Sequence, residues 1–266
     1  MLALEIACGS QPKDQIVAEL YELGATGILE KESGLVAYFP AHVDPRVIEE
    51  RLAGLRLRMV FESDQDWSGR WRERWSGFTV GERFFLVPEW SDEPTPAGRI
   101  RLVLRPGRAC GTGLHPCTHL CLEAMEALVR PGHVILDVGT GSGLLAVAAA
   151  RLGAGCVIAC DLAEEAIEEA RRRFDQEAPG TLLYQGSLRS LRSGVADVVI
   201  VNISAPAAAQ LAPEVRRVSK TGAAAVISGF RVGQRERVRA ALGAAGFAEP
   251  ESRERDGWQA LLCYTG

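Results

Sequence analysis

The sequence predicts an α/β fold in which a Rossmann-like sheet with helices on both faces follows a small α+β domain. Three observations lead to this prediction. The first 62 residues contain six short elements, in which strand-like and helical patterns succeed one another. From about residue 99, near-continuous apolar strands alternate with helices, which is typical of a parallel sheet covered on both faces. A glycine-rich stretch, LDVGTGSG at 136–143, separates one such strand from the helix after it.

The N-terminal elements follow the order β-α-β-β-α-β, which is the split βαβ or ferredoxin-like pattern. Ser33-Gly34 separates two strand candidates as a hairpin turn would, and Asp44 is placed to cap the second helix. The six elements are LALEIA, PKDQIVAELYEL, TGILEKE, LVAYFP, DPRVIEERLAGL and LRLRMVFE. We therefore assign residues 1–62 to a ferredoxin-like domain.

This N-terminal domain is acidic. Residues 1–62 contain ten Asp and Glu against six Lys and Arg, which accounts for the net charge of −4 of the whole 266-residue chain. An acidic surface repels a phosphate backbone and complements a basic protein. The domain is therefore predicted to recognise a basic protein partner and not nucleic acid, unless its acidic surface is merely solvated.

Residues 63–96 are predicted to connect this domain to a second one at 97–266. Trp67, Trp71 and Trp75 are four residues apart, so on a helix they form one aromatic stripe. The arginines between them would allow the stripe to stack on nucleic-acid bases. We favour packing of the stripe onto a domain, because the chain as a whole is not basic. The Pro-rich stretch EWSDEPTPAG at 89–98 is expected to be the looser part of the connector.

Properties of the whole chain exclude several classes of protein. No uninterrupted apolar stretch reaches about 18 residues, so no membrane span is expected. The N-terminal stretch lacks the features of a signal peptide, and the seven cysteines are odd in number and scattered. We therefore expect a cytoplasmic protein with reduced thiols, and we expect it to act as a monomer.

The second domain reads as repeated strand–helix units that end in a pair of strands. Pro116 opens its first helix, and Gly153 stops the helix over 144–152. A last pair of strands surrounds Gly257. The strands are expected at RIRLVL, VILDV, CVIACD, TLLYQG, ADVVIVNI and AAAVISGF, with further helices at AEEAIEEARRRF, 205–218 and 233–245. Ligands of such sheets bind at the carboxyl ends of the strands.

The loop at 136–143 is the first feature at those strand ends. Gly139, Gly141 and Gly143 permit a tight turn and close approach of a ligand, and the helix behind them favours an anionic group. The stretch 141–146 also satisfies the dinucleotide pattern G-x-G-x-x-A. Asp137 argues against a pyrophosphate there and suits the ammonium and sulfonium of S-adenosylmethionine. A structural glycine turn without a ligand is the remaining alternative.

Two polar residues end later strands. Asp161 ends CVIACD and can accept hydrogen bonds from both hydroxyls of a ribose, although an acid there could also cap the next helix. Asn202 lies at the end of the strand in VIVNIS. Its neutral amide can accept a hydrogen bond from an amine without trapping the proton of that amine. A cap for the helix at 205 is its alternative role.

Residues 108–121, RACGTGLHPCTHLC, suggest a metal site by residue type alone. Cys110, His115, Cys117, His119 and Cys121 could in principle ligate zinc. Zinc sites usually combine pairs of closely spaced ligands, and no second cluster completes this one. We therefore expect no metal, and we expect Cys117 and Cys121, one helical turn apart, to face the core.

The segment 105–118, the loop at 136–143, Asp161 and Val201-Asn202-Ile203 together resemble the PrmA family, bacterial methyltransferases of ribosomal large-subunit protein L11. The resemblance extends to 64–67 and to Gly257-Trp258, so it covers nearly the whole chain. It implies a class I methyltransferase sheet, S-adenosylmethionine as the cofactor, and substrate recognition by the N-terminal domain.

The resemblance also implies roles for single residues. Cofactor contacts would include Thr118 and Asn202, while Thr112 would lie near the transferred methyl group. Asn202 and Thr112 are therefore the predicted catalytic residues. The predicted cofactor site comprises Thr118, Asp137, Gly139, Gly141, Gly143, Asp161 and Asn202. The chain departs from the family pattern at Cys110, where Phe is expected, and at Leu114, Cys117 and Ser204.

The implied reaction is methyl transfer to the α-amine and lysine side chains of a basic ribosomal protein, L11. In-line transfer to a neutral amine requires alignment and exclusion of water more than a strong base. His115 could act as a base or could simply cap the helix at Pro116. Lysine methylation of a different protein is the alternative function. RNA methylation is a further one, disfavoured because the chain lacks a basic surface.

Overall fold

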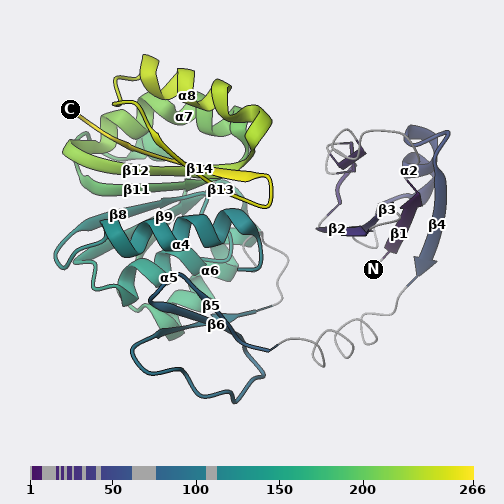
Figure 1. The fold of residues 1–266 in the computed structure, drawn as a ribbon, viewed down its shortest axis with the longest axis horizontal. Helices are drawn as coiled ribbons and strands as arrows, with labels where there is room; N and C mark the ends of the chain where they lie inside the picture. The colour runs from purple at the N-terminus through teal and green to yellow at the C-terminus, as the bar shows by residue number, and fades with distance from the viewer. Residues whose placement is uncertain are drawn as a thin grey trace. The chain divides into compact units, whose positions relative to one another are not determined.

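The structure is a computed structural model in which the chain forms two compact units, residues 1–75 and 76–266. It describes residues 2–7, 16–17, 19–20, 23–25, 27–31, 34–39, 43–61, 76–105 and 113–266. The predicted stripe of Trp67, Trp71 and Trp75 lies outside the described residues, and so does Thr112. Most elements of the two units are labelled in Figure 1.

The N-terminal unit contains a four-stranded antiparallel sheet with the order β2-β3-β1-β4. Asp44 caps α2 as predicted, since its Oδ1 accepts a hydrogen bond from the Arg46 N–H at 2.9 Å. Ile16 and Leu20, two residues of the predicted first helix, are helical and buried in the core of the unit. Among its described residues, the elements are β1 (Leu2–Ala7), β2 (Gly27–Lys31), β3 (Gly34–Phe39), α2 (Pro45–Arg51) and β4 (Arg56–Phe61). The ferredoxin-like classification stays a prediction, because much of the chain between β1 and β2 lies outside the described residues.

The second unit is built on a seven-stranded sheet with the order β10-β9-β8-β11-β12-β14-β13. The strands from β10 to β12 are parallel, whereas β14 is antiparallel to both of its neighbours. Asp256 and Gly257 join β13 to β14 and both have positive φ, 51° and 74°, as a two-residue hairpin turn requires. The strands are β8 (Val134–Val138), β9 (Cys156–Asp161), β10 (Leu182–Gln185), β11 (Ala196–Asn202), β12 (Ser219–Arg231), β13 (Glu251–Arg255) and β14 (Trp258–Tyr264). The predicted alternation of strands and the closing strand pair are thus confirmed.

Helices cover both faces of this sheet, as predicted (Figure 1). One face carries α4 (Pro116–Leu128), α5 (Leu144–Arg151) and α6 (Glu164–Glu177), and the other carries α7 (Ala205–Val218) and α8 (Arg235–Ala244). The strand order reverses direction between β8 and β11, so the chain leaves these two strands toward opposite sides of the sheet. Ligands of doubly wound sheets bind at such a switch point.

The segment predicted as a connector differs from the prediction in its second half. Residues 76–96 belong to the second unit, where β5 (Phe78–Val80) and β6 (Phe84–Pro88) form a small sheet with β7 (Ile100–Leu104). All of β6 is buried. The stretch 89–98 is tied down as well, because Arg101 donates hydrogen bonds to the carbonyls of Ser91 and Glu93, both at 2.7 Å. The buried strand β6 and these hydrogen bonds therefore attach this segment to the second unit, although the stretch after β6 is rich in proline.

Candidate functional site

The predicted site residues lie at the carboxyl ends of neighbouring parallel strands in the seven-stranded sheet. Gly139 follows β8, Asp161 ends β9 and Asn202 ends β11. The parallel registers pair Val138 of β8 with a residue near the end of β9 and with Val201 of β11. The carboxyl ends of these three strands therefore bring together residues that are far apart in the sequence.

The loop after β8 depends on glycine at three positions. Gly139, Gly141 and Gly143 have φ values of 70°, 53° and 81°, in the left-handed region that favours glycine. The N–H groups of Gly139 and Thr140 both donate to the carbonyl oxygen of Cys160, at 2.9 and 3.0 Å. A Cβ on Gly139 would lie 2.5 Å from Ile203 Cγ2, so no other residue fits there without displacing its neighbour.

Asp137 supports this loop from within the protein. The residue is only 1% exposed, and its Oδ2 accepts hydrogen bonds from Thr140 Oγ1 at 2.6 Å and from the Ala146 N–H at 3.1 Å. Burial raises the pKa of the Asp137 carboxyl to about 6, while these hydrogen bonds act in the opposite direction. Its hydrogen bonds thus run to the loop and to the first turn of α5. Direct contact of Asp137 with a cofactor stays a prediction.

Asp161 supports the same loop and keeps capacity for a ligand. Its Oδ2 accepts a hydrogen bond from the Gly141 N–H at 2.9 Å, and its Oδ1 accepts one from the Ala163 N–H at 3.1 Å. Ala163, and not Asp161, is the N-cap residue of α6, so Asp161 contacts the residue at the helix start without occupying the cap position. A carboxylate has about four lone-pair sites, so each oxygen can accept a further hydrogen bond, as from a ribose hydroxyl.

His115 caps α4, which decides between its two predicted roles. Its Nδ1 accepts a hydrogen bond from the Cys117 N–H at 3.2 Å. Although the residue keeps exposed surface, desolvation of the ring and, to a lesser extent, the positive charge of Arg231 together lower the pKa of His115 to about 4. With Nδ1 as the acceptor, the proton of the neutral ring is assigned to Nε2. A ring in this state is a poor proton acceptor, so the geometry supports the cap.

Thr118, in the first turn of α4, contacts Asn202 at the end of β11. Thr118 is 2% exposed, and Asn202 Nδ2 donates to Thr118 Oγ1 at 3.5 Å, the long end of the hydrogen-bond range. The alternative role of Asn202 as a helix cap is not what the structure has, because Ser204 occupies the N-cap position of α7. Two residues predicted to contact the cofactor therefore lie against each other.

Three side chains from separate elements stack beside the start of α4. The guanidinium carbon of Arg231, at the end of β12, lies 4.4 Å from the ring centroid of Trp258. Trp258, at the start of β14, meets the ring of His115 edge-on, with centroids 4.2 Å apart and planes at 75°. We refer to Arg231, Trp258 and His115 as the aromatic stack. Sequence analysis noted Trp258 only through a family resemblance and missed Arg231.

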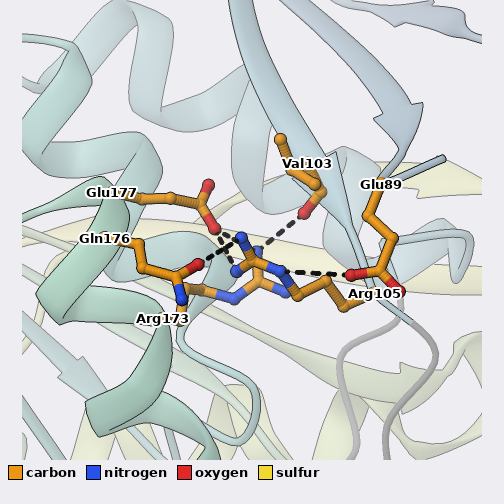
Figure 2. Close-up of polar contacts among 6 residues, drawn as sticks. All are labelled: Glu89, Val103, Arg105, Arg173, Gln176 and Glu177. Carbon is orange, nitrogen blue, oxygen red and sulfur yellow. Dashed lines mark hydrogen bonds and ion pairs between the residues drawn. The ribbon is translucent and has the colours of Figure 1, made fainter. Parts of the chain in front are cut away.

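An ionic network anchors Arg105, the residue that precedes segment 106–112. Arg105 Nη1 donates to Glu177 Oε1, which also pairs with the buried Arg173 at 3.7 Å. Arg173 in turn donates to the carbonyl oxygen of Val103 in β7 at 2.8 Å. The network joins the end of β7 to the end of α6. Figure 2 shows all of its members, Glu89, Val103, Arg105, Arg173, Gln176 and Glu177.

Leu162 is a further candidate that sequence analysis missed. It follows Asp161 directly, and 73% of this large apolar residue is exposed. Its carbonyl oxygen accepts a hydrogen bond from Gln185 Nε2 at 3.1 Å. An exposed apolar side chain next to the acid that is predicted to hold a ribose could cover a flat apolar ring of a ligand. A single leucine after a strand does not form a recognisable sequence pattern. Leu162 is therefore identified as a candidate only by its exposure in the structure.

The histidines and cysteines that suggested a metal site by residue type have other surroundings. His115 caps α4, and the Nε2 of His119 lies 2.9 Å from the Gly113 carbonyl oxygen. Cys117 and Cys121 are buried, as predicted for core-facing residues. In the part of the chain that the structure describes, no three His, Cys, Asp or Glu residues are grouped to hold a metal ion. Cys110 lies outside that part.

A parallel sheet with one inserted antiparallel strand, a glycine loop after its central strand and an acid at the end of the next define the class of S-adenosylmethionine-dependent methyltransferases. Comparison with known proteins is more specific. The profile of the family described as Ribosomal protein L11 methyltransferase (PrmA) matches residues 6–265, and the chain belongs to this family.

Individual relatives agree with this assignment. The chain is 34% identical over 264 residues to a ribosomal protein L11 methyltransferase of Shouchella clausii, with 92% of this chain and 83% of that protein covered. It is 35% identical over 225 residues to one of Desulforamulus reducens, with 82% and 73% covered. A solved ribosomal protein L11 methylase from Lactobacillus delbrueckii subsp. bulgaricus has 27% identity and a TM-score of 0.66, with 72% of this chain and all of that chain covered.

These findings confirm that the protein is an S-adenosylmethionine-dependent protein methyltransferase with a class I methyltransferase sheet. They do not favour the dinucleotide interpretation of the loop at 141–146. Among the helices of the described residues, none is long and apolar enough to cross a membrane.

Proposed function

We propose that this protein transfers methyl groups from S-adenosylmethionine to amino groups of ribosomal protein L11, at its α-amine and lysine side chains. One observation carries most of the support. The family profile matches residues 6–265, which include both compact units. A methyltransferase sheet by itself is shared by enzymes with many substrates. A match that also includes the N-terminal unit favours the substrate of this family.

The residues at the carboxyl ends of β8, β9 and β11 fit the proposed cofactor. Gly139 presents backbone without a side chain, and it has no room for one, since a Cβ there would lie 2.5 Å from Ile203 Cγ2. The amino end of α5 behind the loop suits the carboxylate of the methionine part. We propose that Asp161 holds the ribose and that Leu162 covers the adenine. Thr118, Asp137, Gly139, Gly141, Gly143, Asp161 and Asn202 remain the proposed cofactor-binding residues.

The proposed reaction does not require the protein to supply a strong acid or base. When bound, S-adenosylmethionine supplies an electrophilic methyl group on a sulfonium. The chain has to align a neutral amine with that group and to exclude water. The Asn202 carbonyl oxygen can accept an N–H of the amine, and Thr112 is proposed to lie near the methyl group. His115 is engaged as a cap through Nδ1, so the amine would lose its proton to solvent before transfer.

We propose that the acidic N-terminal unit binds the basic ribosomal protein. The ten acidic and six basic residues at 1–62 support this, because opposite charge favours encounter with a basic partner. The same charge disfavours direct binding of nucleic acid. A cytoplasmic location and a monomeric state are parts of the same proposal, since ribosomal proteins are made and assembled in the cytoplasm.

The test compares the full chain with a chain that begins at Ser76, the first residue of the second unit. Calorimetry measures binding of S-adenosylmethionine, and transfer of labelled methyl groups to purified L11 measures activity. We expect both chains to bind the cofactor equally and only the full chain to methylate L11. Loss of cofactor affinity in the shorter chain would contradict this division of labour.

A different protein substrate is the second candidate, since this chain departs from the family pattern at Leu114 and Ser204. Incorporation of label into another protein, and none into L11, would replace the first proposal by the second. Mass spectrometry of L11 from cells with and without the enzyme decides between them in the native setting. It also counts the methyl groups and identifies the amines.

A further inference from the structure

We propose that Thr118 is a positioning residue for methyl transfer: its hydroxyl orients the side-chain amide of Asn202 so that the amide oxygen faces the acceptor amine. This inference rests on the proposed function, because it takes Asn202 to be the residue that meets the amine. It assigns Thr118 a role beyond the cofactor contact that family resemblance implies.

The two ends of the Asn202 amide are not equivalent for this reaction. Its oxygen can accept an N–H from the amine and leaves the nitrogen lone pair free for the methyl group. Its NH₂ end would instead donate toward that lone pair and occupy it. Since Nδ2 donates to Thr118 Oγ1, the oxygen Oδ1 is turned to the other side and stays available.

Thr118 is well placed to select this orientation. It is 2% exposed and lies in the first turn of α4, where its N–H donates to the His115 carbonyl oxygen at 2.9 Å. A helical threonine can donate its own hydroxyl proton to a carbonyl one turn back, which leaves the oxygen to accept from Asn202. Burial in the first turn of α4 therefore places the hydroxyl beside Asn202, at the end of β11.

The aromatic stack fixes the start of the helix that carries Thr118. The Nδ1 of His115 caps α4, and the ring of His115 rests against Trp258, which Arg231 covers on its face. Arg231 and Trp258 are paired across β12 and β14. The α4 start is thus attached by side chains to the same sheet that carries Asn202.

The distance of 3.5 Å between Asn202 Nδ2 and Thr118 Oγ1 fits a site without substrate. Catalytic hydrogen bonds are often long in that state and shorten in the reacting complex. An amine that donates to Oδ1 would polarise the amide and strengthen the bond from Nδ2 to Thr118. The proposed orientation is therefore reinforced when the acceptor binds.

The test is a double-mutant cycle on the full-length enzyme with the variants T118V, T118S, N202A and T118V/N202A. We expect T118V, which keeps the shape and loses the hydroxyl, to lower kcat about 10- to 100-fold, the loss of one oriented hydrogen bond. T118S, which keeps the hydroxyl, is expected to stay within about fivefold of wild type. The effects of residues that act as a unit are not additive. Adding T118V to N202A is therefore expected to lower kcat no further than N202A alone does.

Binding of S-adenosylmethionine separates this role from a cofactor contact. Because Thr118 is also a proposed cofactor contact, T118V is expected to raise the calorimetric Kd by no more than about tenfold, and kcat is measured at saturating S-adenosylmethionine so that this loss does not enter it. A T118V enzyme with about tenfold weaker cofactor binding and unchanged kcat would overturn the proposal. So would an equal loss of kcat with and without Asn202. T181V removes a hydroxyl that donates to the Ala178 carbonyl oxygen at 2.9 Å, just before β10, and serves as the matched control.

The same experiment distinguishes failure of this inference from failure of the proposed function. The cycle is measured on whichever protein the wild-type enzyme methylates, so a substrate other than L11 leaves the coupling test intact. If T118V does not fold, T118A replaces it in the cycle with the same expected coupling to Asn202.

Discussion

The cofactor half of the site, which comprises the loop at 137–146 and Asp161, is held mainly by the backbone. Its N–H groups donate to the Cys160 carbonyl and to the carboxylates of Asp137 and Asp161. The acceptor half, which comprises Thr118, Asn202 and the aromatic stack, is held by side chains from four elements. The first half is thus built from one loop and the end of the adjacent strand β9, while the second requires side chains from four elements to pack together.

This difference bears on where the chain is free to vary. Leu114, Cys117 and Ser204, which depart from the family pattern, are next to His115 or Asn202 in the acceptor half. The glycine loop and Asp161 keep the pattern. A backbone cradle tolerates few side chains, whereas a packed group of side chains can exchange one member for another of similar size.

The largest expected effect is loss of cofactor binding in D161A. Asp161 accepts bonds from Gly141 and Ala163 and is proposed to hold the ribose, so the loop and the ligand lose support together. We expect the Kd for S-adenosylmethionine to rise by about 100-fold or more, measured by calorimetry. D175A, which removes an exposed carboxylate of α6, is the control. An affinity within about fivefold of wild type would mean that the backbone alone forms the cofactor half.

The next effect, on stability and not on binding, is expected when a side chain is placed at the tightest point of the loop. G139A places a Cβ 2.5 Å from Ile203 in a residue with φ of 70°, so strain and overlap add. We expect a loss of about 3 kcal/mol in the free energy of unfolding, measured with urea. G132A is the matched control, because its φ is 86° but nothing lies within 4 Å, and about 1–2 kcal/mol is expected. Equal losses would show that the contact with Ile203 contributes nothing.

The buried acid of the cofactor half should make stability depend on pH. The pKa of Asp137 is about 6 in the folded protein against an ordinary 3.8, so the unfolded chain loses this proton first as the pH rises. Wild type therefore loses up to about 3 kcal/mol from this residue between pH 4 and 6, and the loss persists above pH 6. D137N has no such proton, and its amide oxygen can still accept from Thr140 and Ala146.

Urea unfolding of D137N and wild type, measured without cofactor at pH 4 and pH 7, checks this. We expect the stability of D137N relative to wild type to improve as the pH rises. A difference that does not change with pH would show that Asp137 is no less easily ionised in the folded protein than in the unfolded chain.

The smallest effect is expected at the helix cap in the acceptor half. H115A removes both the acceptor for the Cys117 N–H and the ring against Trp258, whereas H115N keeps a side chain that can cap. We expect H115A to be less stable than H115N by about 1 kcal/mol in thermal unfolding. Equal stability of the two variants would leave the ring contact as the only contribution of His115.

Much of the cofactor half could be predicted from the sequence because its conformation depends on near neighbours. Gly139, Gly141 and Gly143 mark a left-handed turn between a strand and a helix, and chirality makes that position unfavourable for other residues. Asp44 and His115 were readable as caps for the same reason. The alternation of strands and helices likewise predicted the sheet and the edge at which Asp161 and Asn202 meet.

Only the tertiary structure decided what depends on contacts between distant segments. It joined residues 76–96 to the second unit through the buried strand β6, directed Asp137 to the loop, and left Leu162 exposed beside Asp161. It also brought Trp258 against His115 and Thr118 against Asn202. Periodicity and residue type determine which elements form and which way they face. Which side chains then meet is set by how those elements pack, and no local pattern contains that information.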